Sequence, residues 1–408
     1  MKIVIVGGGT AGWMAACYFA RYNHSSENVN EIVVIESSKI PIIGAGEGST
    51  GLLTKVVDKE FKKWGINEKD FLYNTASTLK LGIRFKDWNG VGTEFISPVQ
   101  PSESAMGSID THLLTSHVKG NYYDSSPSGF LMEENQSTYS KSGDTVLGHS
   151  YHFDAHKVGK YFKEKCMEHG VKNIVGEINQ LNIDNETGFL KSVNIKESTE
   201  KIEADFWVDA SGFSKVLIGN MDGGWESYKE VLPTNAAIPY LYNHKKDENV
   251  LAETLAWAQP NGWMWQIPTQ ERYGCGYVYS DNHTTYDKAL EELIKNTGRD
   301  IEPIRNLKFE AGRVKKFWSK NVLAVGLSCG FLEPLQATSI HSTLIQLDLF
   351  AYHYFNSDLD KIDFKTSTSP STTGILLIAD IESLLTLISG FRMSTLFLLS
   401  TITTSLSN

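Results

Sequence analysis

The sequence predicts an α/β protein that begins with a parallel β-sheet. Two observations carry this prediction. The apolar run KIVIV at residues 2–6 is followed by the glycine-rich turn GGGTAG at residues 7–12 and by a segment of helical composition from Trp13 to Tyr22. A second apolar run at residues 31–35 ends on the acidic residue Glu36. Strand, glycine turn, helix and strand in this order are typical of a Rossmann-like, GxGxxG dinucleotide-binding unit with a right-handed crossover.

The spacing of the glycines within this turn fits a pyrophosphate site. Gly7 permits a tight turn, Gly9 lets the backbone approach the phosphates, and Gly12 lets the helix and the strand pack closely. Glu36 can accept hydrogen bonds from a ribose hydroxyl, and its carboxylate disfavours the 2′-phosphate of NADP. Together these features favour dinucleotide binding over a purely structural glycine turn.

The rest of the chain predicts a sheet-rich substrate region inserted into the dinucleotide-binding domain. Residues 97–150 are rich in Ser, Gly, Asn and His and predict loops, whereas a helix is expected from Asp154 to His169 with Asp154 as its N-cap. After Phe355 the sequence becomes rich in Ser, Thr, Leu and Ile, which predicts an atypical or truncated C-terminal cover. The expected division is residues 1–96 for the first part of the dinucleotide-binding domain, 97–320 for the substrate region with a cofactor-contacting strand near 205–215, 321–355 for the return to the first domain, and 356–408 for the tail.

Composition and charge exclude several classes of function. The net charge of −10 is spread along the chain without a basic stripe, so neither nucleic acid nor an anionic membrane surface is an expected partner. The first apolar run follows Met1 directly without a signal-peptide pattern, which predicts a cytoplasmic protein. The cysteines have no metal-ligand spacing, so we expect no metal site and four buried free thiols, at Cys17, Cys166, Cys275 and Cys329.

Two later segments favour FAD over NAD. Residues 209–212, which start at Asp209, and residues 322–326, which end at Gly326, both read as strands that run into turns of small residues. Such turns can contact a long bound cofactor. Because the sequence carries no second glycine fingerprint for a nicotinamide coenzyme, a separate flavin reductase is expected to supply the electrons.

Several motifs make residues 1–355 similar to the flavin-dependent halogenase family, which includes the tryptophan halogenases. The most specific motif is WxWxIP at residues 263–268, which separates these enzymes from flavin hydroxylases with the same glycine turn. The other motifs are GGGTAGWMAA at 7–16, GAGEGST at 44–50, KLGIRF at 80–85, YHFD at 151–154 and GFLEPL at 330–335.

The resemblance implies a reaction and a cofactor site. Reduced FAD would react with O2 to give the flavin C4a-hydroperoxide, which would oxidise a halide to hypohalous acid. This acid would pass through an internal tunnel to a lysine and then halogenate a small, electron-rich aromatic substrate. The residues assigned to cofactor binding are Gly7, Gly9, Thr10, Ala11, Gly12, Glu36, Gly46, Glu47, Asp209, Gly326 and Leu335.

The resemblance assigns the lysine role to Lys80. Apolar residues at 79, 81, 83 and 85 alternate with Lys80, Gly82 and Arg84, so a single strand would place the lysine and the arginine on one face. That face would line the tunnel. The alternative for this pattern is a solvated strand face.

The resemblance also assigns a shield and a halide site. Trp263 and Trp265 would share one face of a strand and, with Pro268, would separate the flavin from the substrate. The alternative, that the two indoles simply pack in an aromatic core, is given equal weight, and the two roles are compatible. Thr338 and Ser339 match the two residues whose backbone amides hold the halide in members of that family. Backbone N–H groups suit a weakly basic anion because they offer positive dipoles.

One segment departs from the tryptophan-acting members. Gln336 stands where those enzymes have a glutamate credited with accepting the ring proton, and an amide cannot act as a general base near neutral pH. Ala337 also replaces a small hydroxyl residue, and Ser339 replaces a glycine. These changes argue against free tryptophan as the substrate.

Two other functions remain open at this point. One is a flavin-dependent monooxygenase that hydroxylates its substrate directly, and the other is an inactive flavin-binding remnant. The substrate, the halide preference, the identity of the reductase and the oligomeric state, with a homodimer as one option, are not determined by the sequence.

Overall fold

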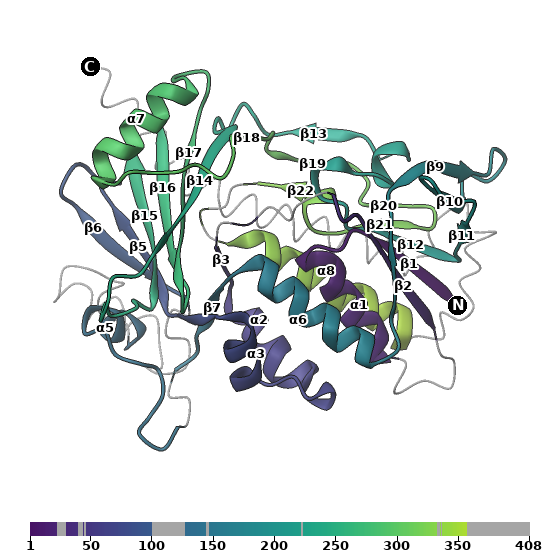
Figure 1. Cartoon of the computed structure of the whole chain (residues 1–408), viewed down its shortest axis with the longest axis horizontal. Helices are drawn as coiled ribbons and strands as arrows, with labels where there is room; N and C mark the ends of the chain where they lie inside the picture. Colours follow the sequence, from purple (N-terminus) through teal and green to yellow (C-terminus); the bar gives the residue numbers. More distant parts are fainter. Residues whose placement is uncertain are drawn as a thin grey trace, which may run out of the picture.

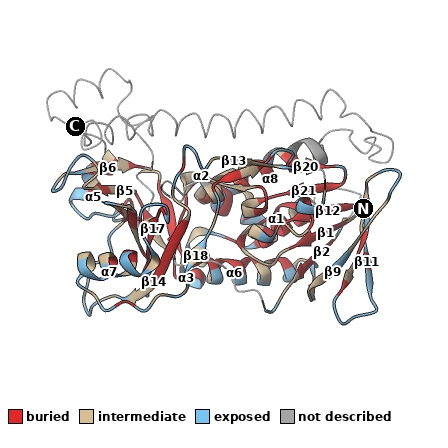
Figure 2. Cartoon of the chain, turned by 90° about the horizontal axis from the view of Figure 1, so that it is seen from above, coloured by how far each residue is buried: buried red, intermediate tan, exposed pale blue. Residues whose placement is uncertain are grey.

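The computed structural model describes residues 1–22, 30–39, 44, 46–99, 127–143, 147–221, 223–332, 335 and 337–356. Two large sheets lie side by side, with a small three-stranded sheet between them (Figure 1). Buried residues follow the strands of both large sheets, whereas the β9–β11 end of the molecule is more exposed (Figure 2). In the described part of the chain, no helix is both long enough and apolar enough to cross a membrane.

The six-stranded sheet confirms the predicted α/β fold. Its order is β20-β21-β12-β1-β2-β8, and all of its pairings are parallel except that of β20 with β21. Helix α1 packs against both α6 and α8 beside this sheet (Figure 1). The elements are β1 (Lys2–Val6), α1 (Thr10–Tyr22), β2 (Glu31–Glu36), α6 (Ala155–Glu168), β8 (Lys172–Val175), β12 (Phe206–Asp209), β20 (Trp318–Ser319), β21 (Val322–Ala324) and α8 (Thr338–Asn356).

The seven-stranded sheet is mainly antiparallel and has the order β18-β14-β17-β16-β15-β5-β6. One face packs a tyrosine-rich cluster against α7, and the other holds the tryptophans of the WxWxIP motif. Its strands come from two distant parts of the chain. They are β5 (Gly82–Lys86), β6 (Glu94–Pro98), β14 (Ala236–Asn243), β15 (Glu253–Gln259), β16 (Gly262–Pro268), β17 (Arg272–Tyr279) and β18 (Leu307–Lys308), with α7 at Tyr286–Thr297.

The three-stranded sheet β3-β7-β4 lies between the two large sheets, as the positions of β3 and β7 in Figure 1 show. It consists of β3 (Glu47–Gly48), β7 (Ser150–Phe153) and β4 (Thr78–Lys80). The remaining elements are α2 (Gly51–Lys55), a π-helical turn (Val56–Glu60), α3 (Glu68–Thr75), α5 (Pro127–Glu133), β9 (Ile178–Ile183), β10 (Leu190–Ile195), β11 (Lys201–Glu203), β13 (Trp225–Ser227), β19 (Gly312–Val314), β22 (Gly330–Phe331), and 3₁₀ turns at Lys62–Trp64, Gly212–Ser214, Ile218–Asn220 and Gly326–Ser328.

The expected helix after Asp154 is confirmed. Helix α6 spans Ala155–Glu168, and the Asp154 carboxylate accepts hydrogen bonds from the backbone N–H groups of His156 and Lys157 at 2.9 and 3.2 Å. Such a cap satisfies donors that have no partner within the helix. In the region expected to form loops, residues 127–133 instead form α5. Pro127 is its first residue, a position where the missing N–H costs nothing.

The single strand expected over residues 79–85 is wrong. The chain leaves β4 at Lys80, and after Leu81 it enters β5 of a different sheet. Arg84 therefore does not share a strand face with Lys80. Instead Arg84 forms ion pairs with Glu253 at 2.6 Å and Glu133 at 3.1 Å, because a half-buried guanidinium needs carboxylate partners.

The cysteines are all free and buried, as expected. Cys17 of α1 and Cys166 of α6 are distant in the sequence, yet their sulfur atoms lie 2.9 Å apart where the two helices pack. The tail from residue 357 onward lies outside the described residues.

Candidate functional site

The glycine turn after β1 has the geometry of a phosphate cradle. Gly7 has a φ of +119°, and a Cβ added there would lie 2.2 Å from the carbonyl oxygen of Ala210. A Cβ on Gly12 would lie 1.9 Å from the carbonyl oxygen of Gly7. At Gly9, by contrast, a Cβ would meet no atom of the described residues within 4 Å. Gly7 and Gly12 thus close the turn, and Gly9 opens onto space beside the N-terminus of α1, where a pyrophosphate fits.

The two turns expected to contact a cofactor, at residues 209–212 and at Gly326, both lie against this glycine turn. A Cβ added to Gly326, which has a φ of +62°, would lie 2.8 Å from the Cβ of Ala11. The Asp209 carboxylate is fully buried and accepts hydrogen bonds from the backbone N–H groups of Leu217 and Ile218, both at 2.7 Å, and from Ser211. Because its oxygens are engaged by the protein, Asp209 holds the turn in shape rather than offering a carboxylate to a cofactor.

Glu36 lies against the turn and retains capacity to accept a hydrogen bond. One carboxylate oxygen accepts from Asn173 at 2.9 Å and from the Lys163 ammonium, and the other accepts from the Trp13 indole at 3.3 Å. A carboxylate oxygen has two lone pairs, so the second oxygen can accept another donor. Its closeness to Gly8, where an added Cβ would lie 1.9 Å away, explains why that position is also glycine.

Glu47 begins β3 of the three-stranded sheet, and Gly46, directly before it, lies against the seven-stranded sheet. Gly46 has a φ of +82°, and a Cβ there would lie 2.9 Å from the Cα of Gly274 in β17. Burial raises the pKa of the half-buried Glu47 to about 7, and the nearby Asp154 acts in the same direction. Asp154 itself is paired with Arg272 at 2.6 Å. Glu47 is therefore more easily protonated than an exposed glutamate.

Lys80 is deeply buried, with 2% of its surface exposed. Burial lowers the pKa of its ammonium group to about 8, because the charged form loses hydration. The side chain points to Gly48, since a Cβ added to that glycine would lie 2.9 Å from Lys80 Nζ. A buried amine whose pKa lies near the working pH is suited to chemistry that uses both its charged and its neutral forms.

The segment assigned to the halide lies against the same glycine. The added Cβ at Gly48 would lie 3.6 Å from the Cβ of Ala337. Helix α8 begins directly afterwards, so the amides of Thr338 and Ser339 belong to its first turn and have no acceptor within the helix. The structure therefore brings Lys80 and the start of α8 together. Gln336 lies outside the described residues.

Ala337 carries backbone strain at this point. Its φ of +56° lies in the left-handed region, which is unfavourable for a residue with a Cβ by about 1–2 kcal/mol. Strain of this kind is concentrated at functional sites. The conformation turns the chain into α8 and was not foreseeable from the residue type.

Trp263 and Trp265 share one face of β16, as the sequence predicted, with ring centroids 6.2 Å apart. Trp263 is buried and Trp265 is half-buried. Both belong to an apolar cluster that also contains Leu335, the residue before Gln336. The two indoles are thus core residues, and their cluster borders the segment that leads into α8. Pro268 ends the same strand, and its carbonyl accepts a hydrogen bond from Thr78 at 2.7 Å.

Gly276→Ala tests how tightly Trp265 is placed. A Cβ at position 276 would lie 2.0 Å from the Trp265 ring, so the indole must move. We expect a loss of about 1–3 kcal/mol in the free energy of unfolding, measured by denaturant titration, as is usual for overpacking. The double variant Gly276→Ala/Trp265→Leu should recover part of this loss. If the loss of unfolding free energy in the double variant equals the sum of the losses in the two single variants, the two residues are not in contact.

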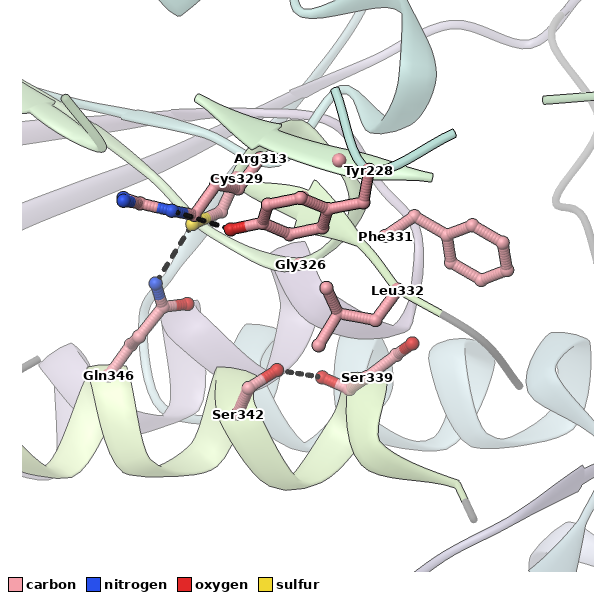
Figure 3. A pocket seen from close by; sticks show the side chains of 11 residues that line it. Tyr228, Arg313, Gly326, Cys329, Phe331, Leu332, Ser339, Ser342 and Gln346 are labelled. Carbon is pink, nitrogen blue, oxygen red and sulfur yellow. Dashed lines mark hydrogen bonds between the residues drawn. The ribbon is translucent and has the colours of Figure 1, made fainter. Parts of the chain in front are cut away.

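A pocket lies between the turn at Gly326 and the start of α8 (Figure 3). Gly326 and Ser339 both line it, and Gln346 donates a hydrogen bond to the Cys329 sulfur at 3.0 Å. The Arg313 guanidinium donates to the Tyr228 hydroxyl at 2.9 Å. The sequence did not single out these polar residues, because no motif marks them. The lining residues are Tyr228, Gly312, Arg313, Gly326, Cys329, Gly330, Phe331, Leu332, Ser339, Ser342 and Gln346.

Three further residues lie at the site without having been assigned a role. Gly48 and His152 belong to motifs that were recognised, but their closeness to Lys80 depends on strand register. His341, in the first turn of α8, forms a hydrogen bond with Thr50 at 2.8 Å. The only signal for it was a histidine two residues after the predicted anion pair Thr338 and Ser339.

Comparison with known proteins matches this geometry to one family. The sequence model described as "Tryptophan halogenase" matches residues 2–366. The chain is 29% identical over 379 residues to 7-chloro-L-tryptophan 6-halogenase KtzR of Kutzneria sp. (strain 744), which covers 85% of this chain and 72% of that protein. It is also 29% identical over 389 residues to tryptophan 7-halogenase RebH of Lentzea aerocolonigenes, covering 88% and 71% of the two chains.

Solved structures give the same result. Xcc4156, a flavin-dependent halogenase from Xanthomonas campestris, superposes with a TM-score of 0.83 at 26% identity, covering 96% of this chain and 76% of that one. BrvH, a flavin-dependent halogenase from Brevundimonas sp. BAL3, superposes with a TM-score of 0.78 at 28% identity, covering 95% and 77%.

Proposed function

This chain belongs to the tryptophan halogenase family of flavin-dependent halogenases, and on that premise we propose that it halogenates a small, electron-rich aromatic compound with reduced FAD, O2 and a halide ion. The observation that carries the proposal is the convergence of the Lys80 amine and the start of α8 on Gly48. Reduced FAD, when bound, activates O2 for the oxidation of halide to hypohalous acid. The protein's own residues must then hold the cofactor, the halide and the oxidised halogen.

The cradle at Gly9 is the proposed site of the FAD pyrophosphate. The open space at Gly9 and the N–H groups at the start of α1 fit two phosphates, while Glu36 can accept from a ribose hydroxyl. We assign Thr10 and Ala11, at the start of α1, and Gly326, which lies against Ala11, to the same site. Asp209 supports the site by shaping its turn.

The first turn of α8 is the proposed halide site. Its first backbone N–H groups, which have no acceptor within the helix, and the positive end of a 19-residue helix favour an anion. Lys80 then receives the oxidised halogen. Its ammonium form can donate a hydrogen bond to hypohalous acid, and its amine form can take the halogen as a haloamine with release of water; a pKa of about 8 keeps both forms accessible.

Halogenation is favoured over direct hydroxylation. The chain has the WxWxIP strand and Lys80, and the relatives with which it aligns are named halogenases. In our proposal Trp263 and Trp265, with Leu335 in their cluster, keep organic substrate away from the flavin. A separate flavin reductase would supply the reduced cofactor in transient encounters, and we place the enzyme in the cytoplasm.

The proposed function is tested by product analysis. The protein is incubated with FAD, a generic flavin reductase, NADH and a panel of indoles, phenols and pyrroles, with and without bromide. Mass spectrometry should detect brominated product only with bromide. Hydroxylated product that is independent of bromide would identify a monooxygenase, and bound flavin without product would identify an inactive remnant.

The missing carboxylate at Gln336 predicts a preference among halides and rings. Without a positioned base the ring proton must leave to water, so we expect bromide or iodide to be used in preference to chloride, on activated rings such as indole or phenol. Gln336→Glu should raise chlorination or extend the range to less activated rings. A general base contributes roughly 10²–10⁴-fold when correctly placed, so a smaller gain is expected from an unoptimised one.

The measurement compares initial rates of wild type and Gln336→Glu with chloride and bromide, on one indole and one less activated arene. Gln336→Ala serves as the control for loss of the amide alone. If the glutamate variant changes neither the halide ratio nor the substrate ratio, Gln336 is not at the site of ring deprotonation.

A further inference from the structure

The sheet that carries Lys80 also carries a histidine bonded at both ring nitrogens. His152 is fully buried on β7. Its Nε2 lies 2.8 Å from the Thr254 hydroxyl of β15, and its Nδ1 lies 3.4 Å from the Thr78 hydroxyl of β4. The ring therefore joins the three-stranded sheet to the seven-stranded sheet.

The two hydroxyls determine which nitrogen holds the proton. Thr78 donates its hydroxyl hydrogen to the carbonyl of Pro268 at 2.7 Å. A hydroxyl has a single hydrogen, so toward His152 the Thr78 oxygen can act only as an acceptor, and Nδ1 must be the donor. In a neutral imidazole Nε2 is then an acceptor, and the Thr254 hydroxyl donates to it. The histidine is held as its neutral Nδ1–H tautomer.

The Lys80 side chain passes this ring. In register, Gly48, His152 and Thr78 form one row across β3, β7 and β4, and Lys80 faces Ser150 in the next row on the same face. The Lys80 Nζ nevertheless reaches Gly48, on the far strand. To reach Gly48, the Lys80 side chain must pass over β7 between Ser150 and His152. The His152 ring therefore lies along one side of the lysine side chain.

We propose that His152 is a positioning residue for Lys80, and that its ring, fixed by Thr78 and Thr254, directs the lysine amine over Gly48 toward the start of α8. This inference rests on the proposed function, because it assigns His152 a role in delivery of the halogen to Lys80. The ring does not touch the substrate and transfers no proton.

The electrostatics of the pair agree with this role. Burial lowers the pKa of His152 well below its ordinary range, and the charge of Lys80 acts in the same direction. Taking up a proton at Nε2 would also require the Thr254 hydroxyl to turn from donor to acceptor. The ring stays neutral, so it can stand beside the lysine without repelling its ammonium form.

A spectroscopic measurement tests the fixed tautomer without turnover. In protein labelled with ¹⁵N-histidine, with the His152 signals assigned by their loss in His152→Phe, the shifts should report Nδ1–H and Nε2 without hydrogen. They should not titrate between pH 6 and pH 9. An Nε2–H tautomer, or titration in this range, would overturn the proposal.

Substitutions at Thr254 test the positioning role. Thr254→Val removes the donor to Nε2 while keeping the side-chain shape, and Thr254→Ser retains the donor. With bromide and indole, we expect Thr254→Val and His152→Phe to lower kcat for product at least tenfold, with the KM for indole nearly unchanged. Oxidant released to solution, trapped by monochlorodimedone, should rise correspondingly. Thr254→Ser should restore most of the product.

The outcomes separate this inference from the proposed function. If wild type makes no bromide-dependent product or oxidant, the proposed function fails. If wild type is active and Lys80→Met is not, but Thr254→Val keeps the wild-type ratio of product to released oxidant, only the role of His152 fails. Equal losses in Thr254→Val and Thr254→Ser, accompanied by lower thermal stability, would reduce His152 to a structural residue and overturn the inference.

Discussion

Lys80→Met should lower the rate of halogenated product formation by roughly 10²-fold or more, the scale set by removal of a group that acts directly on the transferred atom. A thioether can neither donate a hydrogen bond to hypohalous acid nor form a haloamine. The fold should tolerate the change, because Lys80 is 2% exposed and methionine has a similar length without a charge to bury. FAD affinity and consumption of reduced flavin should stay near those of wild type.

The measurement is the rate of bromide-dependent product, set beside FAD affinity from fluorescence quenching. Lys86→Met is a suitable control, since Lys86 lies on β5 with its ammonium 4.2 Å from the Trp257 ring and outside the site. Near wild-type product from Lys80→Met would mean that free hypohalous acid performs the halogenation, and the role of Lys80 would be withdrawn.

Gly9→Glu should abolish FAD binding. The side chain would project into the space proposed for the pyrophosphate, where it adds both bulk and a negative charge. Because a Cβ at this position meets no atom of the described residues within 4 Å, the apoprotein should fold with nearly unchanged thermal stability. Flavin fluorescence titration and thermal unfolding of the apoprotein are the two measurements.

Gly9→Ala is the matched comparison without the charge: a methyl group there meets no described protein atom within 4 Å, so the fold should be kept, and FAD affinity should fall less than in Gly9→Glu. Gly12→Ala provides the contrast: its Cβ would lie 1.9 Å from the Gly7 carbonyl oxygen, so it should destabilise the fold itself. Retained flavin affinity in Gly9→Glu would remove the glycine turn from the cofactor site.

Local features of the chain were predictable because their causes are local. The parallel βαβ start follows from an apolar run, a glycine spacing and a terminal acid that all lie within 36 residues. The N-cap at Asp154 and the alternation of Trp263 and Trp265 follow from helix and strand periodicity. The family resemblance added the assignment of Lys80, which no pattern of charge or hydropathy distinguishes from a surface lysine.

What the tertiary structure decided concerns contacts between distant segments. No periodicity could show that Lys80 leaves its strand before Arg84, because the break at Leu81 is set by the meeting of two sheets. The row of Gly48, His152 and Thr78 likewise depends on strand register, which is fixed by how all the faces pack together.

The buried polar groups show most directly what the residue types predict and what their surroundings decide. Asp209 and Glu36 were both recognised as acidic residues at strand ends, but burial and hydrogen-bond partners gave them different roles. The depressed pKa of Lys80 arises from desolvation, which depends on every segment that surrounds the side chain. The sequence alone therefore determined the kind of fold and the residue types of the site, and only the packing of distant segments determined how those residues are placed and charged.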